Sequence, residues 1–309
     1  MRIMTGAPMP EGADTVVRQE DTERDGAAVL IQVATPLGTS VRLRGADIHA
    51  GDTLIEPGGA LTSIDIGVAA ALGHGRVLVG AQPRVALLAT GDELVLVGDP
   101  PGPAQLTDSN SPMLTAAVLE AGGVPTFLGI ARDTQDSVRG MLEAASTFDV
   151  VVSSAGVSVG DHDWVRDVAA ELGTISTWRV AMRPGKPVLI GTLGAAIFIG
   201  LPGNPVSSSV TFELFARPVI RRMQGSHDVW RRRIRVRLGE EMTKPAGLET
   251  YARAVLRASE HDDLQHAFSA GDQGSSMLHS LTRADCLLVF PADVDVIAVG
   301  TIVEAIPLR

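Results

Sequence analysis

The chain has 309 residues, more than one ordinary hydrophobic core accommodates, so two or three domains are expected. Hydrophobic residues make up 45% of it and aromatic residues only 4%, which excludes intrinsic disorder and predicts cores of Val, Leu, Ile and Ala. A net charge of −10 excludes general nucleic-acid affinity, and no apolar stretch approaches the roughly 20 residues of a membrane span. The start of the sequence lacks the apolar run of a signal peptide, so a cytoplasmic protein is expected.

The first 80 residues are predicted to be mostly β-strand with turns. Short strands are expected at residues 15–17 and 29–33, separated by the charged turn 20–26. A helix is predicted over residues 62–72, with Ser63 as a possible cap and Gly73 just past its end.

The next region alternates between strand and helix patterns. Because repeated β-α units form parallel sheets, the α/β fold class is predicted here, as a mostly parallel, doubly wound sheet between residues 82 and 224. Ser111 is expected to cap one helix, and either Asp133 or Thr134 to start another. Asn204 is expected to cap a long final helix. Strands are predicted at 84–89, 124–130, 149–153, 174–180, 187–190 and 196–200, and helices at 111–121, 134–146, 163–172 and 205–223.

After residue 225 the pattern changes to short strands with turns between them, at 234–238, 251–256, 286–290 and 302–306. This predicts a separate small β-barrel or sandwich. The single cysteine, Cys286, lies in one of these apolar runs, so a packed core thiol in a reducing compartment is expected.

Ligands of doubly wound sheets bind beyond the carboxyl ends of the strands. Three polar, glycine-containing loops are placed there, and glycines allow backbone amides to approach a ligand. No nucleotide-binding glycine fingerprint, phosphate-binding P-loop or hydrolase nucleophile elbow is present. The candidate ligand-binding residues of the three loops are Thr90, Gly91 and Asp92; Ser154, Gly156 and Ser158; and Pro202, Gly203, Asn204 and Pro205.

Acidic residues gather at these loops, namely Asp92, Glu93, Asp133, Asp161 and Asp163. Beside a phosphate-bearing ligand they predict Mg²⁺, because Mg²⁺ prefers oxygen ligands and no Cys/His set for zinc exists. The alternative for Asp133 is a helix cap alone.

Residues 178–187 (WRVAMRPGKP) supply the basic counterpart, with Arg179, Arg183 and Lys186. The planar guanidinium of arginine matches the oxygens of phosphate or of another tetrahedral oxyanion, while a plain surface turn is the alternative. A second basic run, residues 221–237, is interpreted as a solvated linker and strand edge, with an anion site or partner surface left open.

Taken in order, these motifs resemble the molybdopterin molybdenumtransferase family, the MoeA-type enzymes and the related domain of gephyrin. The matching stretches are residues 2–12 (RIMTGAPMPEG), 44–48 (RGADI), 90–94 (TGDEL), 108–111 (DSNS), 153–163, 183–187 (RPGKP) and 201–205 (LPGNP). The resemblance implies a partial N-terminal β domain at residues 1–48, a partial linking domain with a helix at 49–81, a molybdopterin-binding α/β domain at 82–228 and a small C-terminal β-barrel at 229–309. It also implies a homodimer.

The resemblance further implies the reaction, in which adenylyl-molybdopterin is cleaved with molybdate and Mg²⁺, AMP leaves and the dithiolene receives the metal. Asp133, Asp163 and Glu93 would hold Mg²⁺ or the pterin phosphate. Arg179, Arg183 and Lys186 would guide oxyanions, with Arg253 and Ser275 contributed by the C-terminal domain. Thr5, Arg42 and Asp47 match positions near the site in family dimers. No protein nucleophile is needed.

Two departures from the family pattern stand out. Ala155 replaces a usual glycine, which costs roughly 1 kcal/mol if that position has a positive φ. The chain also opens inside the family's N-terminal region, at a segment expected to be an internal strand. An upstream part is therefore expected to be missing, with weaker dimerisation and slower turnover. The alternatives are a molybdopterin adenylyltransferase, which the flanking segments disfavour, and a gephyrin-like scaffold or inactive binding form.

Overall fold

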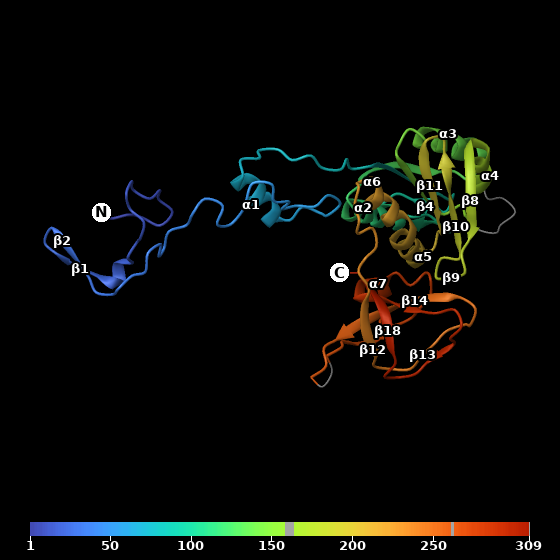
Figure 1. The fold of residues 1–309 in the computed structure, drawn as a ribbon. Coiled ribbons are helices and arrows are strands. Elements are labelled where there is room, and N and C mark those ends of the chain that lie inside the picture. The colour runs from blue at the N-terminus through green and yellow to red at the C-terminus, as the bar shows by residue number, and fades with distance from the viewer. Residues whose placement is uncertain (158–163, 261–262, 309) are drawn as a thin grey trace. The chain divides into compact units, whose positions relative to one another are not determined.

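A computed structural model describes residues 1–157, 164–260 and 263–308. The chain divides into two compact units, Met1–Glu56 and Pro57–Arg309 (Figure 1). Within the described residues, no helix has both the length and the apolar character needed to cross a lipid bilayer.

The first unit contains a 3-10 turn at Gln19–Asp21 and one antiparallel hairpin of β1 (Thr22–Asp25) and β2 (Ala28–Ile31). The prediction of a turn over residues 20–26 is wrong, because the charged segment Thr22–Asp25 forms a strand that pairs with β2. The turn has only two residues and begins at Gly26, whose φ is +58°. The strand expected at 15–17 is also wrong, and so is the internal strand expected where the chain opens, at residues 2–5. At 15–17, Val16 donates to Thr39 O without a continuing ladder.

The second unit begins with α1 (Ser63–Ala71). Thr62, not Ser63, caps it: the Thr62 side chain accepts from Asp65 N, and the Asp65 carboxylate accepts from Thr62 N at 2.7 Å. This reciprocal pair satisfies two amides that the first turn leaves unpaired. Gly73 follows the helix with φ +84°, as the sequence predicts.

The central sheet has six strands in the order β6-β3-β7-β11-β10-β8. Its first four strands are parallel, and β10 runs antiparallel to both β11 and β8. The mostly parallel sheet is therefore confirmed. The strands are β3 (Arg84–Thr90), β6 (Val124–Ala131), β7 (Val150–Ser154), β8 (Gly173–Arg179), β10 (Pro187–Leu193) and β11 (Ala196–Leu201).

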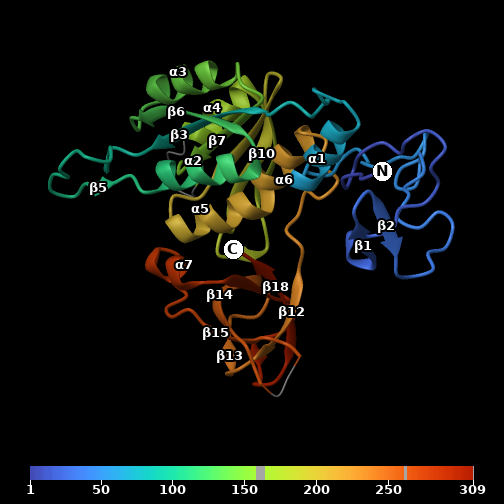
Figure 2. The same ribbon diagram turned by 90° about the vertical axis from the view of Figure 1, so that its left-hand side faces the viewer.

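Helices cover both faces of this sheet (Figure 2). On one face α3 (Gln135–Ala145) and α4 (Trp164–Leu172) bury apolar side chains against Ala86, Val151 and Phe198. On the other face lie α2 (Asn110–Ala121), α5 (Pro205–Thr211), a π-helical segment Phe212–Ala216 and α6 (Arg217–Met223). The covered faces explain why the strands are continuous apolar runs.

Two predicted helix caps need correction. Ser111 does not cap α2; Asp108 Oδ1 accepts from the amides of Asn110 and Ser111 at 3.0 and 3.1 Å. Asn204 precedes α5 without capping it through its side chain. Of the two residues expected to start α3, Thr134 is confirmed, because its side chain accepts from Ser137 N, so Asp133 is not the cap. The long helix expected over 205–223 is also confirmed, with a π-helical turn at its middle.

The C-terminal region forms a closed five-stranded barrel, because β15 pairs with both β12 and β14. Its strands are β12 (Ile234–Leu238), β14 (Glu249–Arg257), β15 (His266–Ser269), β16 (Cys286–Phe290) and β18 (Ile302–Pro307). The short pair β13 (Met242–Thr243) and β17 (Val296–Ile297) and the helix α7 (His279–Arg283) complete this region. β15, β13 and β17 were not anticipated from the sequence.

Cys286 lies in the barrel core with no exposed surface, and burial raises the pKa of its thiol to about 12. Because the thiolate is the reactive form, we expect native protein to react with a thiol reagent at pH 8 at least about 100-fold more slowly than unfolded protein. Absorbance of the released thiol chromophore, with and without denaturant, measures this. Equal rates would contradict a packed thiol.

Candidate functional site

The polar loops are gathered at one edge of the central sheet. β6, β3, β7, β11 and β8 all run in the same direction, so their carboxyl ends share that edge. The predicted acidic loops follow β3 and β6, the glycine loops follow β7 and β11, and the basic turn follows β8. With strands about 4.8 Å apart, the acidic end near β3 lies roughly 20 Å from the basic end at β8. The edge therefore offers one long, charge-separated site.

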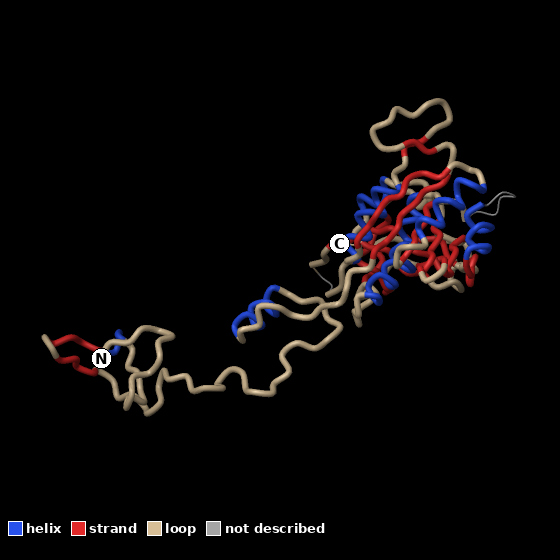
Figure 3. Tube along the Cα trace, turned by 90° about the horizontal axis from the view of Figure 1, so that it is seen from above, coloured by secondary structure: helices blue, strands red, loops and turns tan. Residues whose placement is uncertain are grey.

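At the acidic end, the loops after β3 and β6 hold each other through backbone amides. Asp92 N donates to Asp133 Oδ2 at 3.3 Å, and Asp133 N donates to Asp92 Oδ1 at 3.4 Å. Both side chains and Glu93 are exposed. Gly91 has φ +141°, a backbone conformation that residues with a side chain rarely adopt, so glycine is favoured at this turn. The residues after Glu93 leave the domain as a long loop, with β4 (Leu94–Val95) and β5 (Leu106–Thr107) paired at its base (Figure 3).

In the middle of the edge, the loops after β7 and β11 approach closely. Asn110 Nδ2 donates to Ser154 Oγ at 2.8 Å and to Gly203 O at 2.7 Å. Ala155 N donates to Leu201 O at 3.1 Å. Asn110 was missed among the candidate residues, although its Asp-x-Asn pattern before a helix was visible in the sequence.

Ala155 is strained, as the comparison with the family pattern anticipated, because its φ is +72°. A left-handed conformation costs a non-glycine residue roughly 1–2 kcal/mol, partly offset by glycine's greater freedom in the unfolded chain. We therefore expect Ala155→Gly to raise the free energy of unfolding by up to about 1 kcal/mol. Urea denaturation measures this, with the exposed helical Ala116→Gly as a control of opposite sign. A lower midpoint for Ala155→Gly would contradict the strain.

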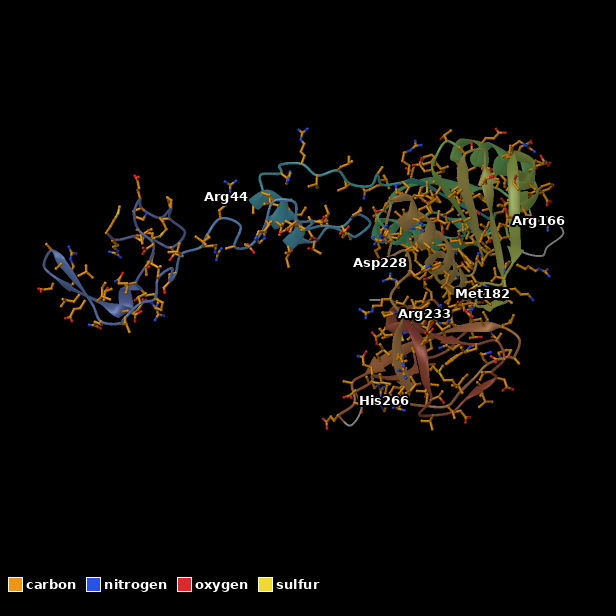
Figure 4. The ribbon with its side chains drawn as sticks, in the orientation of Figure 1. Arg44, Arg166, Met182, Asp228, Arg233 and His266 are labelled. Carbon is orange, nitrogen blue, oxygen red and sulfur yellow. The ribbon has the colours of Figure 1, made fainter. Side chains whose placement is uncertain are left out.

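At the basic end, the turn between β8 and β10 contacts both the α/β domain and the barrel. Val180 N donates to Lys186 O at 2.9 Å, and β9 (Met182–Arg183) adds a parallel strand to β14 of the barrel. A Cβ on Gly185 would lie 2.3 Å from Thr211 Cγ2 of α5. Figure 4 places Met182 at this junction between the α/β domain and the barrel. The turn is therefore held rigidly, while the side chains of Arg179, Arg183 and Lys186 are exposed.

The barrel reaches the same edge through the loop that contains Ser275. Ser275 O accepts from Val206 N at 3.1 Å, and Ser275 Oγ accepts from Asn204 Nδ2 at 3.0 Å. Arg253 is fully buried behind this loop, where its guanidinium donates to Ser280 Oγ and to the carbonyl oxygens of Asp272 and Gly274. Burial lowers the pKa of Arg253. Its contacts favour a supporting role for Arg253 more than direct contact with a ligand.

The remaining candidates divide into two groups. Ser158, Asp161 and Asp163 lie outside the described residues. Thr5, Arg42 and Asp47 lie in the first unit, where all three are exposed. Across the described part of the chain, no group of three or more His, Cys, Asp or Glu side chains is arranged to hold a metal ion.

The fold and its loop-lined edge define an α/β ligand-binding domain joined to a closed β-barrel. Residues 86–222 match the family described as probable molybdopterin binding domain. Residues 1–73 match the MoeA N-terminal region, domains I and II, and residues 235–308 match the MoeA C-terminal region, domain IV.

Individual relatives agree with these matches over nearly the whole chain. A molybdopterin molybdenumtransferase of Nostoc sp. is 39% identical over 297 residues, covering 94% of this chain and 68% of the relative. One from Haemophilus influenzae is 32% identical, covering 100% of this chain and 77% of the relative. The crystal structure of the molybdopterin biosynthesis MoeA protein from Pyrococcus horikosii matches with a TM-score of 0.81 and 30% identity, over 97% of this chain and 73% of that one. The chain belongs to the molybdopterin molybdenumtransferase family.

Proposed function

We propose that this chain is a transferase of molybdenum cofactor biosynthesis that inserts molybdate into adenylyl-molybdopterin and releases AMP. The insertion of molybdate is inferred from the names of its relatives, which are molybdopterin molybdenumtransferases. The observation that carries the finer proposal is the long edge with acidic loops near one end and a rigid basic turn at the other. A nucleotide-linked pterin is long enough to contact several strand ends, and its phosphates and the incoming molybdate need different counter-charges.

The acidic end fits Mg²⁺ as the partner of the substrate's phosphates. Mg²⁺ in proteins is commonly held by one or two carboxylates together with substrate phosphates and water. Asp133 and Glu93 are exposed carboxylates beside the paired loops, and within the described residues neither belongs to an ion pair. Asp163 would join them. Bound there, Mg²⁺ would neutralise charge that develops on phosphate oxygens as AMP leaves.

The chain's own residues would orient the substrate and position the oxyanion. Backbone amides near Thr90, Gly91, Ser154 and Gly156, and the loop 202–205, would contact the pterin and its phosphate. The exposed Arg183 and Lys186, with Arg179, would hold molybdate at the other end, where the stiff turn keeps their positive charge in place. Ser275 would contribute by fixing Asn204.

We further propose that the protein acts as a homodimer through its first unit. β2 is exposed along its whole length, with Val29, Leu30 and Ile31 each more than half exposed. An isolated two-stranded hairpin is at best marginally stable in water, so this surface favours a partner. Thr5, Arg42 and Asp47 would then lie near the site of the neighbouring subunit. Sedimentation equilibrium tests the dimer.

The test of the reaction is to mix the protein with adenylyl-molybdopterin, Mg²⁺ and molybdate and to follow AMP. Release that requires both molybdate and Mg²⁺ is expected. AMP release without any need for molybdate would contradict the proposal. Formation of adenylyl-molybdopterin from ATP and molybdopterin would favour the adenylyltransferase alternative, which the matched N- and C-terminal regions disfavour. Capture of a partner protein without AMP release would favour a scaffold.

A further inference from the structure

Asn110, the first residue of α2, joins three separate segments at the sheet edge. Its side chain is buried, and its amide nitrogen donates to Ser154 Oγ, at the last residue of β7, and to Gly203 O in the loop after β11. Its own backbone amide donates to Asp108 Oδ1, which also caps the next residue. Asn110 is thus fixed at its backbone by Asp108 and reaches both loops with one side-chain nitrogen.

The amide nitrogen of asparagine carries two hydrogens, so this one atom can donate to Ser154 Oγ and to Gly203 O at once. The Gly203 carbonyl can only accept, so its short contact identifies the Asn110 atom as the nitrogen and fixes the orientation of the amide. A carboxylate of the same size would place an acceptor against the Gly203 oxygen. A serine or alanine would not reach both loops. The residue type is therefore set by the need to hold two loops at once.

The two loops also approach each other directly. The Cβ of Ala155 lies 3.2 Å from the position that a Cβ on Gly203 would take, and Ala155 N donates to Leu201 O beside them. Close approach of two backbones leaves their separation sensitive to any group that bridges them. Asn110 bridges them from the N-terminal end of a twelve-residue helix whose buried apolar side chains, Leu114, Val118 and Ala121, belong to the core.

We propose that Asn110 is a positioning residue, which sets the separation of the loops after β7 and β11 so that a single ligand contacts both. The part of this proposal that concerns the substrate rests on the proposed function. Asn110 acts through Ser154 and Gly203 and does not take part in the chemistry. Its loss should weaken binding of the pterin substrate more than it slows the chemical step, because misplaced loops lose ground-state contacts as well as transition-state contacts.

The first test does not depend on activity. Native-state hydrogen exchange is compared for wild type, Asn110→Ala and Thr115→Ala. Thr115 is the control because it lies on the same helix and bonds only within it, its hydroxyl donating to Ser111 O at 2.7 Å. In Asn110→Ala, protection of the Ala155 amide should fall at least tenfold while the amides of β3 keep theirs. Unchanged protection at Ala155, or an equal loss in Thr115→Ala, would overturn the proposal.

The second test uses kinetics of AMP release. Asn110→Ala should raise the KM for adenylyl-molybdopterin about tenfold or more with a smaller change in kcat. Ser154→Ala keeps the contact between Asn110 and Gly203, so its KM should lie between those of Asn110→Ala and wild type. If Asn110→Ala does not fold, Ser154→Ala is measured in its place. If the KM of Asn110→Ala equals that of Thr115→Ala, the positioning role of Asn110 is overturned. If wild type releases no AMP, the proposed function fails, while the exchange experiment still decides whether Asn110 holds the loops.

Discussion

Asp133→Asn is expected to lower turnover by about 100-fold while pterin binding changes much less. The substitution keeps an oxygen that can accept from Asp92 N, so the paired loops should keep their geometry. It removes the negative charge that is proposed to hold Mg²⁺ where charge develops at the phosphate. AMP release at several Mg²⁺ concentrations, with substrate affinity measured separately, tests this expectation.

Asp136→Asn provides the matched control for that variant. Asp136 is an exposed carboxylate in the first turn of α3, three residues further along the chain and outside the paired loops. Its loss removes the same charge from the neighbourhood and should leave turnover within about twofold, since surface charges of this kind contribute little. Wild-type rates without any metal dependence, or equal losses in both variants, would remove Asp133 from the proposed metal site.

Arg183→Ala is expected to raise the molybdate concentration needed for half-maximal activity. The guanidinium of Arg183 is proposed to hold molybdate, and its removal should cost roughly 1.5–3 kcal/mol of binding free energy. This corresponds to an increase of about 10- to 150-fold in that concentration. The backbone pairing of Arg183 with Thr250 does not use the side chain, so β9 should remain joined to β14. AMP release titrated with molybdate measures the effect.

Two further variants distinguish the effect of the planar guanidinium of Arg183 from the effect of positive charge alone. Arg183→Lys keeps the positive charge but not the planar pair of donors, so it should recover only part of the molybdate affinity. Arg222→Ala removes an exposed arginine from the last turn of α6 and should leave the molybdate dependence unchanged. A molybdate dependence unaltered in Arg183→Ala would assign Arg183 to holding the turn alone.

The candidate site was largely visible in the sequence because its residues lie in loops that directly follow apolar strands. Once β3, β7 and β11 are placed in a mostly parallel sheet, Thr90, Ser154 and Leu201 must end at the same edge. The helix caps were less predictable. Thr62, Asp108 and Thr134 compete with neighbouring polar residues of similar capping strength, and the backbone geometry of each entry decides among them.

Contacts between segments far apart in the chain were not predictable. Asn110 is separated from Ser154 by 44 residues and from Gly203 by 93, so no local pattern indicates that it joins them. The family resemblance implies that Arg253 lies at the ligand, but the closed barrel and the loop 272–274 enclose it. The π-helical turn at Phe212–Ala216 likewise has no signal in the apolar periodicity of the helix.

The alternating strands and helices, the polar loops at the strand ends and the opposite charges of the acidic loops and the basic turn can be read from local periodicity and chain order. How the loops are held depends on contacts made in the folded molecule. The hydrogen bonds of Asn110, the pairing of β9 with β14 and the contact of Ser275 with Asn204 each join distant segments. Such contacts form only when the apolar clusters on the two faces of the sheet and the core of the barrel are packed. Burial of apolar surface throughout the folded chain supplies the free energy that orders these loops, and no single stretch of chain supplies it.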